Sequence, residues 1–451
     1  MSTAAPERAR PIDSRQGREA GRMLRADVPR RALATLTTGD RDPLGILAAQ
    51  NRTRVANLLP LRAERMAASA FAFYRGTAAI MAADLSRDPH TGILVGSCGD
   101  AHVANFGFYA SQQRELVFDL NDFDEAAWAP WEWDLKRLVT SIVIAGQASS
   151  RAQTVVDDAA VTAVRAYARA LAARAKLTAL QRYYAHSDPT AATGSLDAAS
   201  RSALGLAVRD AQRRTGERAA RKLTERGADG RVRLIERPPT MTHVDVALHE
   251  RLQQFFDDYV ASAQVDVRML LNQFEVVDLC HRVVGVGSVG TRSYLLALQD
   301  GDGNVLLLQA KEAAASVLAE HGGITQPTLS QAYVDANGHG ARVVGMQRIL
   351  QAVSDPLLGH LRTPAGDFYV RKFHDMKGGI DMETLEDAPF RRYAEACAAT
   401  LARAHSQSAT ATKVSAYIGG GRAIADAMLE WAYAYAAMSR ADYDAFVAAR
   451  A

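Results

Sequence analysis

Two short apolar segments of the chain each end in a group of polar residues. Residues 92–100 ("GILVGSCGD") lead into Asp100, His102 and Asn105, and residues 114–122 ("RELVFDLND") lead into a second, acidic group. Short runs rich in Val, Ile, Leu and Phe, bounded by Gly, Asp and Asn, favour buried strands followed by loops. We therefore expect two successive strands with polar side chains at their ends.

The rest of the chain alternates between helical and β-rich patterns. One β-rich region holds the hairpin turn "DGDGN" and continues through strand-like residues 341–353 ("ARVVGMQRILQAV"). The pattern predicts an α+β fold in five segments: a loosely held, Arg-rich N-terminal arm (1–45), a mixed segment with the two strands and a following helix (46–149), a helical insert (150–265), a β-rich domain (266–380) and C-terminal helices (381–451).

Composition excludes several classes of protein. With 53 basic and 50 acidic residues among 451, the net charge of +3 is too near neutral to indicate nucleic-acid binding. The three cysteines lie far apart, so neither a zinc finger nor a disulfide framework is expected. The sequence has no signal-like N-terminal segment and no run of 18 apolar residues, which predicts a cytoplasmic protein without a membrane span.

The first polar group has the residue types that phosphoryl transfer requires. That reaction needs a carboxylate to orient the acceptor hydroxyl and metal ions to neutralise phosphate charge. Asp100, followed five residues later by Asn105, fits this division, with Asp122 as the second metal carboxylate. Mg²⁺ prefers such oxygen ligands. Asp119 and Asp124 are the alternatives for the metal, and a pair of polar turns between buried strands is the structural alternative.

A glycine-rich segment could hold a nucleotide. "GVGSVG" places Gly285, Gly287 and Gly290 in a GxGxxG pattern around Ser288. The pattern is weak alone, but strand-like residues on both sides predict a hairpin over phosphates, not the strand-to-helix turn of a dinucleotide fold. Lys311 ends an apolar strand 21 residues after the last glycine, where a kinase places its phosphate-pairing lysine. The alternative is a tight hairpin and a surface lysine.

These motifs carry a resemblance to known families. "GDAHVANFG", "FDLNDFDEA" and "WEWDLKRL" resemble the catalytic loop, metal segment and following helix of the aminoglycoside phosphotransferase and choline kinase branch of the protein-kinase-like superfamily. "GVGSVG" and "LLLQAKEA" are similar to the kinase glycine-rich loop and lysine strand. The strings "FAFYRG", "CGDAHVANFG", "NDFDEAAWAPWEWDLKRL" and "FHDMKGG" resemble the bacterial family DUF2252 from about residue 20 onward.

The resemblance implies ATP and Mg²⁺ as cofactors and gives roles to single residues. Asp100 would orient or deprotonate the acceptor hydroxyl, and Lys311 would contact the α- and β-phosphates. Glu320 would pair with Lys311, with Glu312 as the competitor. His102 would support the loop by hydrogen bonding.

Two further residues have less certain partners in this comparison. Asp134 would cap the following helix or tether the catalytic loop. Arg75 would reach the acceptor or a phosphate, or pair with a loop carboxylate.

The order of the motifs is reversed relative to a kinase, because Asp100 precedes Lys311 by 211 residues. We therefore expect a two-lobed, circularly permuted kinase-like fold. Residues 266–380 would form the nucleotide-binding N-lobe, residues 46–149 the catalytic part of the C-lobe, and residues 381–451 its completion. Joined surface ends permit such rewiring.

The expected function is ATP- and Mg²⁺-dependent phosphoryl transfer to a hydroxyl, possibly of a small molecule. Three alternatives stay open: transfer of AMP to a protein, a nucleotide-binding regulator without turnover, and a metal-dependent phosphohydrolase that uses Asp100, His102 and Asp122. The sequence names neither the acceptor nor the oligomeric state.

Overall fold

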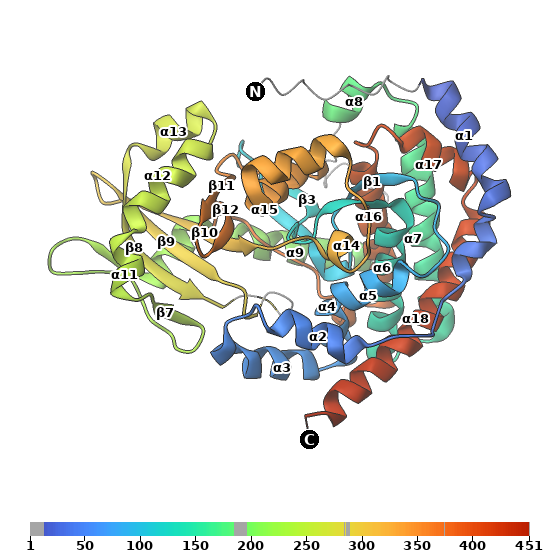
Figure 1. Cartoon of the computed structure of the whole chain (residues 1–451), viewed down its shortest axis with the longest axis horizontal. Helices are drawn as coiled ribbons and strands as arrows, with labels where there is room; N and C mark the ends of the chain where they lie inside the picture. Colours follow the sequence, from blue (N-terminus) through green and yellow to red (C-terminus); the bar gives the residue numbers. More distant parts are fainter. Residues whose placement is uncertain (1–12, 185–195, 284, 286–288, 374, 451) are drawn as a thin grey trace.

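The computed structural model describes residues 13–184, 196–283, 285, 289–373 and 375–450. It has an α+β fold in which an antiparallel sheet with its own helices lies beside a larger, mainly helical body (Figure 1). The α+β class predicted from the sequence is confirmed.

Six strands form the sheet in the order β11-β12-β10-β9-β8-β7, and every neighbouring pair is antiparallel. The elements of this part are β7 (Met241–His243), α11 (Val246–Glu250), α12 (Leu252–Ser262), α13 (Val265–Leu271), β8 (Phe274–Arg282), β9 (Ser293–Asp300), β10 (Val305–Ala313), α14 (Val317–Glu320), α15 (Thr328–Leu350), β11 (Gly359–Thr363) and β12 (Gly366–Lys372).

The alternation of side chains along β10 orients Lys311. Leu308 and Ala310 belong to an apolar cluster that contains residues of α12, α13 and the sheet. Successive side chains of a strand point to opposite faces. Leu307, Gln309 and Lys311 therefore lie on the face of the sheet that is turned away from α12 and toward the helical body.

The helical body is built around α6 (Trp131–Ala148), in which every residue from 131 to 146 is buried. Its other elements are α1 (Ser14–Asp27), α2 (Pro43–Asn51), α3 (Leu59–Ala67), α4 (Ala70–Arg75), α5 (Ala78–Leu85), β1 (Leu94–Ser97), β2 (Phe106–Ala110), β3 (Leu116–Leu120), β4 (Ala127–Pro130), α7 (Gln153–Arg174), α8 (Ala179–Tyr184), α9 (Ala198–Gln212), α16 (Asp387–His405), α17 (Ala411–Ile418) and α18 (Arg422–Ala448). A helix buried all round must pair its charged residues, and Lys136 does so with Asp88, 3.4 Å away.

The two strands predicted from the polar-ended segments are present. β1 pairs with β4, and β2 forms an antiparallel hairpin with β3. The loop that follows β1 carries Asp100, and the segment that follows β3 carries Asp122. Both polar groups therefore lie at strand ends, as the sequence predicts.

Three expectations about organisation are wrong. Residues 13–45 are not a loosely held arm, because α1 packs on α17 and Leu33 lies fully buried in the main core. Gly21 permits this close approach, since a Cβ there would lie 2.2 Å from the carbonyl oxygen of Lys413. Both contacts join opposite ends of the chain, so a local pattern does not report them.

The segment 150–265 is not a single helical insert. Its first helix, α7, belongs to the main core and packs along α16, whereas β7 joins the sheet. Between them, α10 (Gly216–Leu223) is followed by the paired strands β5 (Thr224–Arg226) and β6 (Val232–Leu234). Residues 341–350, expected as a strand, are the second half of α15. Val343 and Val344 favour strands, but this segment buries one side against the sheet as a helix. The tertiary packing therefore outweighs the local strand preference.

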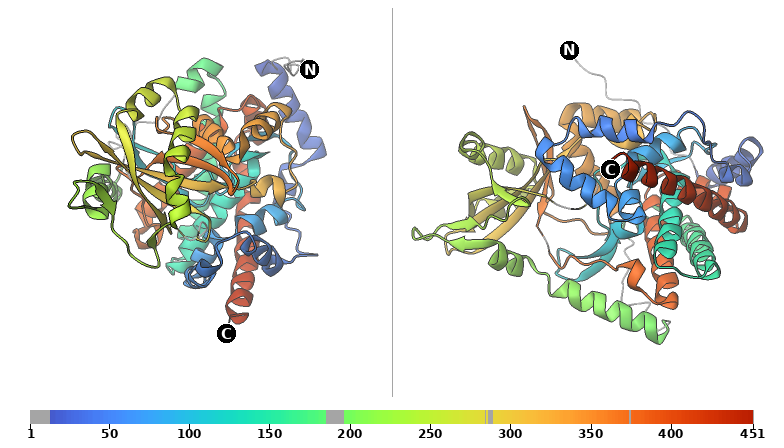
Figure 2. Two further views of the ribbon diagram at one scale, coloured as in Figure 1. Left: turned by 60° about the vertical axis from the view of Figure 1, so that its left-hand side comes forward. Right: turned by 90° about the horizontal axis from the view of Figure 1, so that it is seen from below.

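The C-terminal end of α16 lies directly against β1, although more than 300 residues separate them. The Gly96 N–H donates to the Ser408 hydroxyl at 2.9 Å, and the Thr410 hydroxyl donates to the Leu94 carbonyl at 2.6 Å. α1 and α18 lie on the side of the molecule away from the sheet in all views (Figure 2).

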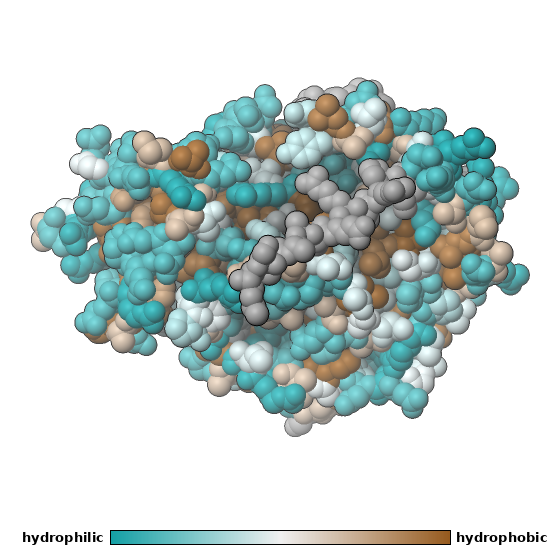
Figure 3. Space-filling view, turned by 45° about the horizontal axis from the view of Figure 1, so that its top comes forward, coloured by the Kyte–Doolittle hydropathy of each residue, from teal (hydrophilic) through white to brown (hydrophobic). Residues whose placement is uncertain are grey.

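The face shown in Figure 3 is mostly hydrophilic, with scattered hydrophobic residues, as is usual for a water-facing surface. Within the described part of the chain, no helix combines the length and the apolar character needed to cross a bilayer.

Candidate functional site

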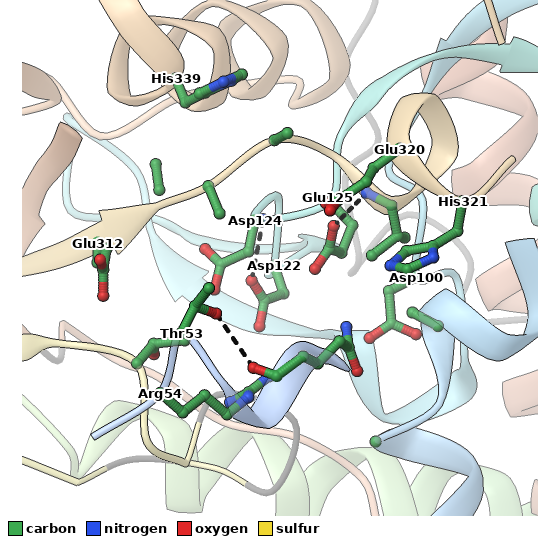
Figure 4. Close-up of a pocket in the computed structure, with 18 of the residues that line it drawn as sticks. Thr53, Arg54, Asp100, Asp122, Asp124, Glu125, Glu312, Glu320, His321 and His339 are labelled. Atoms are coloured by element: carbon green, nitrogen blue, oxygen red, sulfur yellow. Dashed lines mark hydrogen bonds between the residues drawn. The ribbon is translucent and has the colours of Figure 1, made fainter. Parts of the chain in front are cut away.

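A cavity of about 760 Å³ brings together segments that are distant in the sequence. One wall comes from the sheet and α14, a second from the segments after β1 and β3, and a third from residues 49–54 and 75–78 of the N-terminal helices. Seven carboxylates line it (Figure 4): Asp100, Asp122, Asp124, Glu125, Glu312, Glu320 and Asp367. An enclosed group of acids of this kind suits a cation or a cation-bound anion.

The loop that carries Asp100 is fixed by α6. The Asp134 carboxylate accepts the Cys98 N–H at 2.8 Å and the Gly99 N–H at 3.0 Å, so Asp134 is the tether that the sequence offered as one option. Gly99 has φ +79°, and a Cβ there would lie 2.3 Å from the Glu125 carbonyl oxygen. This turn therefore requires glycine.

The Asp100 carboxylate is oriented by an arginine that sequence reasoning missed. Arg137 Nε donates to Asp100 Oδ1 at 2.5 Å, and the same guanidinium donates to the Tyr74 carbonyl at 3.0 Å. The signal was present, because Arg137 follows Asp134 by three residues and shares its helix face. The Asp100 side chain keeps 20% of its surface exposed, in the cavity.

His102 lies beside Asp100 but forms no side-chain hydrogen bond with a described residue. Its Nε2 lies 3.5 Å from Asp100 Oδ2, and its ring is almost fully buried. Burial lowers the pKa of His102 to about 4, so the imidazole is neutral at neutral pH. Its Nδ1 has no partner among the described residues, so support of the loop by hydrogen bonding stays a prediction.

Asn105 and Asp122 face the same cavity. Asn105 Nδ2 donates to the Asp100 carbonyl at 2.7 Å, which leaves the amide oxygen for another partner. Burial opposes ionisation of Asp122, but the charges of Lys311 and Arg371 outweigh it and lower the pKa of Asp122 to about 2. Asp122 is therefore ionised at physiological pH.

Lys311 joins the sheet to the acidic segment. Its ammonium group forms an ion pair with Asp124 and lies 3.9 Å from Asp122 Oδ1. Burial lowers the pKa of Lys311, but Asp122 and Asp124 outweigh burial and raise it above the ordinary value. The Tyr369 hydroxyl donates to Asp124 at 2.5 Å, so Asp124 is held from two strands of the sheet.

The expected partners of Lys311 are wrong. The Glu312 carboxylate binds Arg292, with an Nη1–Oε1 distance of 2.6 Å, and Glu320 is exposed on α14 and forms no ion pair with a described residue. Lys311 instead reaches Asp124 because Arg342 of α15 donates to the Asp124 carbonyl at 2.8 Å and holds the acidic segment against the sheet.

Asp119, the second metal candidate, is not brought to the cavity. Its carboxylate is fully buried, lies 3.0 Å from Arg403 Nη2 and accepts the Ala352 N–H at 2.8 Å. Asp119 lies within β3, so the alternation of side chains along the strand fixes the side to which it points. Asp122 follows the strand, and this alternation does not apply to it. Of the two, only Asp122 lines the cavity.

The glycine-rich segment lies where β8 passes into β9. Gly285 lines the cavity, and both Gly285 and Gly290 have positive φ, of 68° and 88°. Gly287 and Ser288 lie outside the described residues.

Residues that follow α2 hold this glycine-rich segment. Arg54 Nη1 donates to the Val289 carbonyl at 2.5 Å, and the Val55 N–H donates to Gly290 at 2.7 Å. Sequence reasoning did not anticipate this contact. Arg75, the residue with an undecided partner, lines the cavity and forms no ion pair with a described carboxylate.

Comparison with known proteins identifies the family of this chain. Residues 54–449 match a family described as "Uncharacterized protein conserved in bacteria (DUF2252)". The chain belongs to the DUF2252 family. The match spans most of the chain and agrees with the resemblance noted from the motifs. No curated protein and no solved structure matches significantly.

Asn105 and Asp122 offer oxygen donors to the cavity that could hold a divalent cation. Asp122 is ionised, and the amide oxygen of Asn105 is not used by the hydrogen bond of its nitrogen. Hard, oxygen-only ligand sets suit Mg²⁺. Asp124 is more engaged with Lys311 and Tyr369, so Asn105 and Asp122 would hold the ion.

Glu125 is a further cavity residue that sequence reasoning missed in the DUF2252 chain. It follows Asp124 directly, and its Oε2 accepts the Val317 N–H at 2.9 Å. Burial raises the pKa of Glu125 to about 7. The protonated carboxyl therefore stabilises the fold. That stabilisation is complete below pH 4.5 and is lost as the pH rises through 7.

Glu125→Gln should remove this pH dependence. The amide keeps an acceptor oxygen for Val317 but cannot ionise, so the variant should exceed the wild type in stability at pH 8 by up to about 3 kcal/mol and match it near pH 5. Urea unfolding from pH 5 to 8, without metal or nucleotide, measures the difference. Exposed Glu115→Gln is the control. Parallel wild-type and Glu125→Gln curves would contradict the assignment.

Proposed function

We propose that this protein is an ATP- and Mg²⁺-dependent phosphotransferase that acts on a hydroxyl group. The proposal rests mainly on one observation. Asp100, Asn105 and Asp122 from the helical body line one cavity, and Lys311 from the sheet meets its wall by pairing with Asp124 and lying 3.9 Å from Asp122 Oδ1. A carboxylate for the acceptor, two oxygen ligands and a phosphate-binding lysine are the parts that phosphoryl transfer uses.

The arrangement around Lys311 supports a kinase-like nucleotide site. The glycine-rich segment connects β8 to β9, and β10, which carries Lys311, pairs with β9. In protein kinases a glycine-rich loop covers the phosphates and the lysine lies on the third strand. A helix, α15, also follows that strand and packs near it.

The path of the chain supports a circular permutation. After β12 the chain reaches the helical body, where residues 375–380 bond to β2: the Phe108 N–H donates to the Gly378 carbonyl at 2.8 Å. It then forms α16, which resembles the helix before the catalytic loop in unpermuted relatives. α16 ends beside β1, where a direct link would restore the kinase order.

Each site residue has its own role in the proposed reaction. Asp100, held by Arg137, accepts the proton of the acceptor hydroxyl. The acceptor oxygen then bonds to the γ-phosphorus of ATP while the bond from that phosphorus to the bridging oxygen breaks, and ADP leaves. Lys311 binds the α- and β-phosphates, which requires it to exchange part of its pairing with Asp124. Asn105 and Asp122 would hold Mg²⁺, which neutralises phosphate charge when bound.

Thermal unfolding with ATP, with and without Mg²⁺, tests the proposal. ATP at about 100 times its Kd should stabilise the wild type by roughly 2.7 kcal/mol, and more strongly with Mg²⁺. Lys311→Ala and Asp122→Asn should lose this stabilisation, measured against each variant's own ligand-free midpoint, whereas exposed Lys222→Ala should keep it. A wild type that does not respond to ATP would contradict the proposal.

The mass added to an acceptor separates the related activities. Phosphate is expected here, whereas AMP would indicate the alternative transfer with a reversed nucleotide. Release of inorganic phosphate alone, without dependence on Lys311, would indicate a phosphohydrolase.

A further inference from the structure

We propose that Arg54 binds the terminal phosphate of the nucleotide, so that the segment after α2 completes the phosphate site from the opposite wall of the cavity. This inference rests on the proposed function and adds to it a residue outside the motifs that the sequence resemblance covers.

Arg54 lies between the cavity and the glycine-rich segment. It lines the cavity on the wall opposite Asp124 and Glu125 (Figure 4). The same side chain is joined to the glycine-rich segment through the Val289 carbonyl at 2.5 Å. A Cβ on Gly290 would lie 3.1 Å from the Arg54 Cβ, so the two segments are in close contact. Arg54 is therefore at the end of the cavity where a glycine-rich loop would cover phosphates.

The contacts between the two segments are made to carbonyl oxygens of the described residues Gly285, Val289 and Gly290. Arg54, Val55 and Arg65 all donate to carbonyl oxygens of the glycine-rich segment, the last to Gly285 at 2.6 Å. None of these three contacts uses an N–H group of the loop. Backbone N–H groups of such loops are the usual donors to phosphate. The N-terminal segment thus holds Gly285, Val289 and Gly290 without using their N–H groups in these contacts.

Neither Arg54 nor its neighbour Arg62 forms an ion pair with a described carboxylate. Arg62 is 2% exposed and makes one side-chain hydrogen bond, to Asn51 Oδ1 at 2.9 Å. Arg62 Nε and Nη2 have no partner among the described residues. Burial, and then Arg54, lower the pKa of Arg62 to about 9.

Arg62 does not line the cavity, so Arg54 is the member of this pair that a bound anion would meet. Burial also lowers the pKa of Arg54, while Glu125 and Glu312 across the cavity oppose this shift. With nucleotide and Mg²⁺ bound, Mg²⁺ would balance the negative charge of these carboxylates. Phosphate oxygens would balance the positive charge of Arg54. An arginine supplied in this way to the transferred phosphoryl group stabilises its charge in other phosphotransferases.

The test compares ATP and ADP, because only ATP has the terminal phosphate. Kd values of both nucleotides with Mg²⁺ are measured by calorimetry on the full chain. Arg54→Met should raise the Kd of ATP at least tenfold and change that of ADP less than twofold, since a charge-assisted hydrogen bond is lost for ATP only. Arg54→Lys should recover part of the loss, and exposed Arg22→Ala should equal the wild type.

Arg65→Ala separates the phosphate contact from support of the loop. Arg65 holds Gly285 but does not line the cavity, so its loss should weaken ATP and ADP equally. The inference would be overturned if Arg54→Met raised the Kd of ATP and of ADP equally, or changed neither. If Arg54→Met fails to fold, Arg54→Lys replaces it. Its ratio of the ATP Kd to the ADP Kd should then exceed that of the wild type. A wild type that binds neither nucleotide would instead refute the proposed function.

Discussion

Asp100→Asn is expected to slow phosphoryl transfer by about 10²- to 10⁴-fold, the usual contribution of a positioned general base. The asparagine keeps the size of the side chain and an oxygen for Arg137 Nε, so the loop tethered by Asp134 should stay in place. It cannot accept the proton of the acceptor hydroxyl. ATP binding should change little, because Lys311 belongs to β10 and Gly285 lines the cavity from the sheet side, whereas Asp100 lies in the loop after β1.

Formation of ADP from ATP, with a hydroxyl compound or water as acceptor, measures the rate, and thermal unfolding with ATP measures binding. Asp302→Asn, in the exposed turn of the β9–β10 hairpin, is the matched control and should behave as the wild type. An unchanged rate in Asp100→Asn would remove Asp100 from the mechanism. A loss of ATP binding would place Asp100 in the nucleotide site and not at the acceptor.

Arg403→Met is expected to lower the free energy of unfolding by about 3–5 kcal/mol, the usual effect of leaving one member of a buried ion pair without its partner. Arg403 and Asp119 have side-chain exposures of 2% and 1% and lie 3.0 Å apart. Arg403 also donates to the Leu350 carbonyl, at the end of α15. The substitution therefore leaves an uncompensated carboxylate between α16, β3 and α15.

Urea unfolding of single and double variants tests this prediction. Asp119→Leu together with Arg403→Met should recover part of the loss, because no charge is then left unpaired. Arg440→Met is the control for an exposed pair, since Arg440 and Asp444 are 64% and 59% exposed, and it should cost less than about 1 kcal/mol. A loss below 1 kcal/mol in Arg403→Met would contradict the buried-pair account. It would also reopen Asp119 as an available ligand.

Local patterns predicted the parts of this protein that depend on neighbouring residues. The apolar runs before Asp100 and Asp122 are strands, because alternation and turn residues act over a few positions. The apolar run of β10 likewise predicted the strand that carries Lys311. The polar residue types at the strand ends were sufficient to suggest oxygen ligands and a base. The match of residues 54–449 to DUF2252 agrees with the motifs that the sequence displays.

Tertiary contacts alone decided which of these residues meet. Asp119 and Asp122 are three positions apart and chemically alike, yet Arg403 of α16 takes one of them into the core and leaves the other at the cavity. Lys311 pairs with Asp124, 187 residues away, and not with the nearby Glu312 or Glu320. Arg54 reaches the glycine-rich segment across 235 residues.

The sequence by itself therefore determined the strands, the turns and the chemical types of the site residues. The tertiary structure decided the pairing of charges, the packing of α1 and α7 into the core and the wall that the N-terminal helices add to the cavity. The physical reason is that hydrophobic periodicity is a property of adjacent residues. The partner of a buried charge is instead set by which distant segments the core brings within a few ångströms of it.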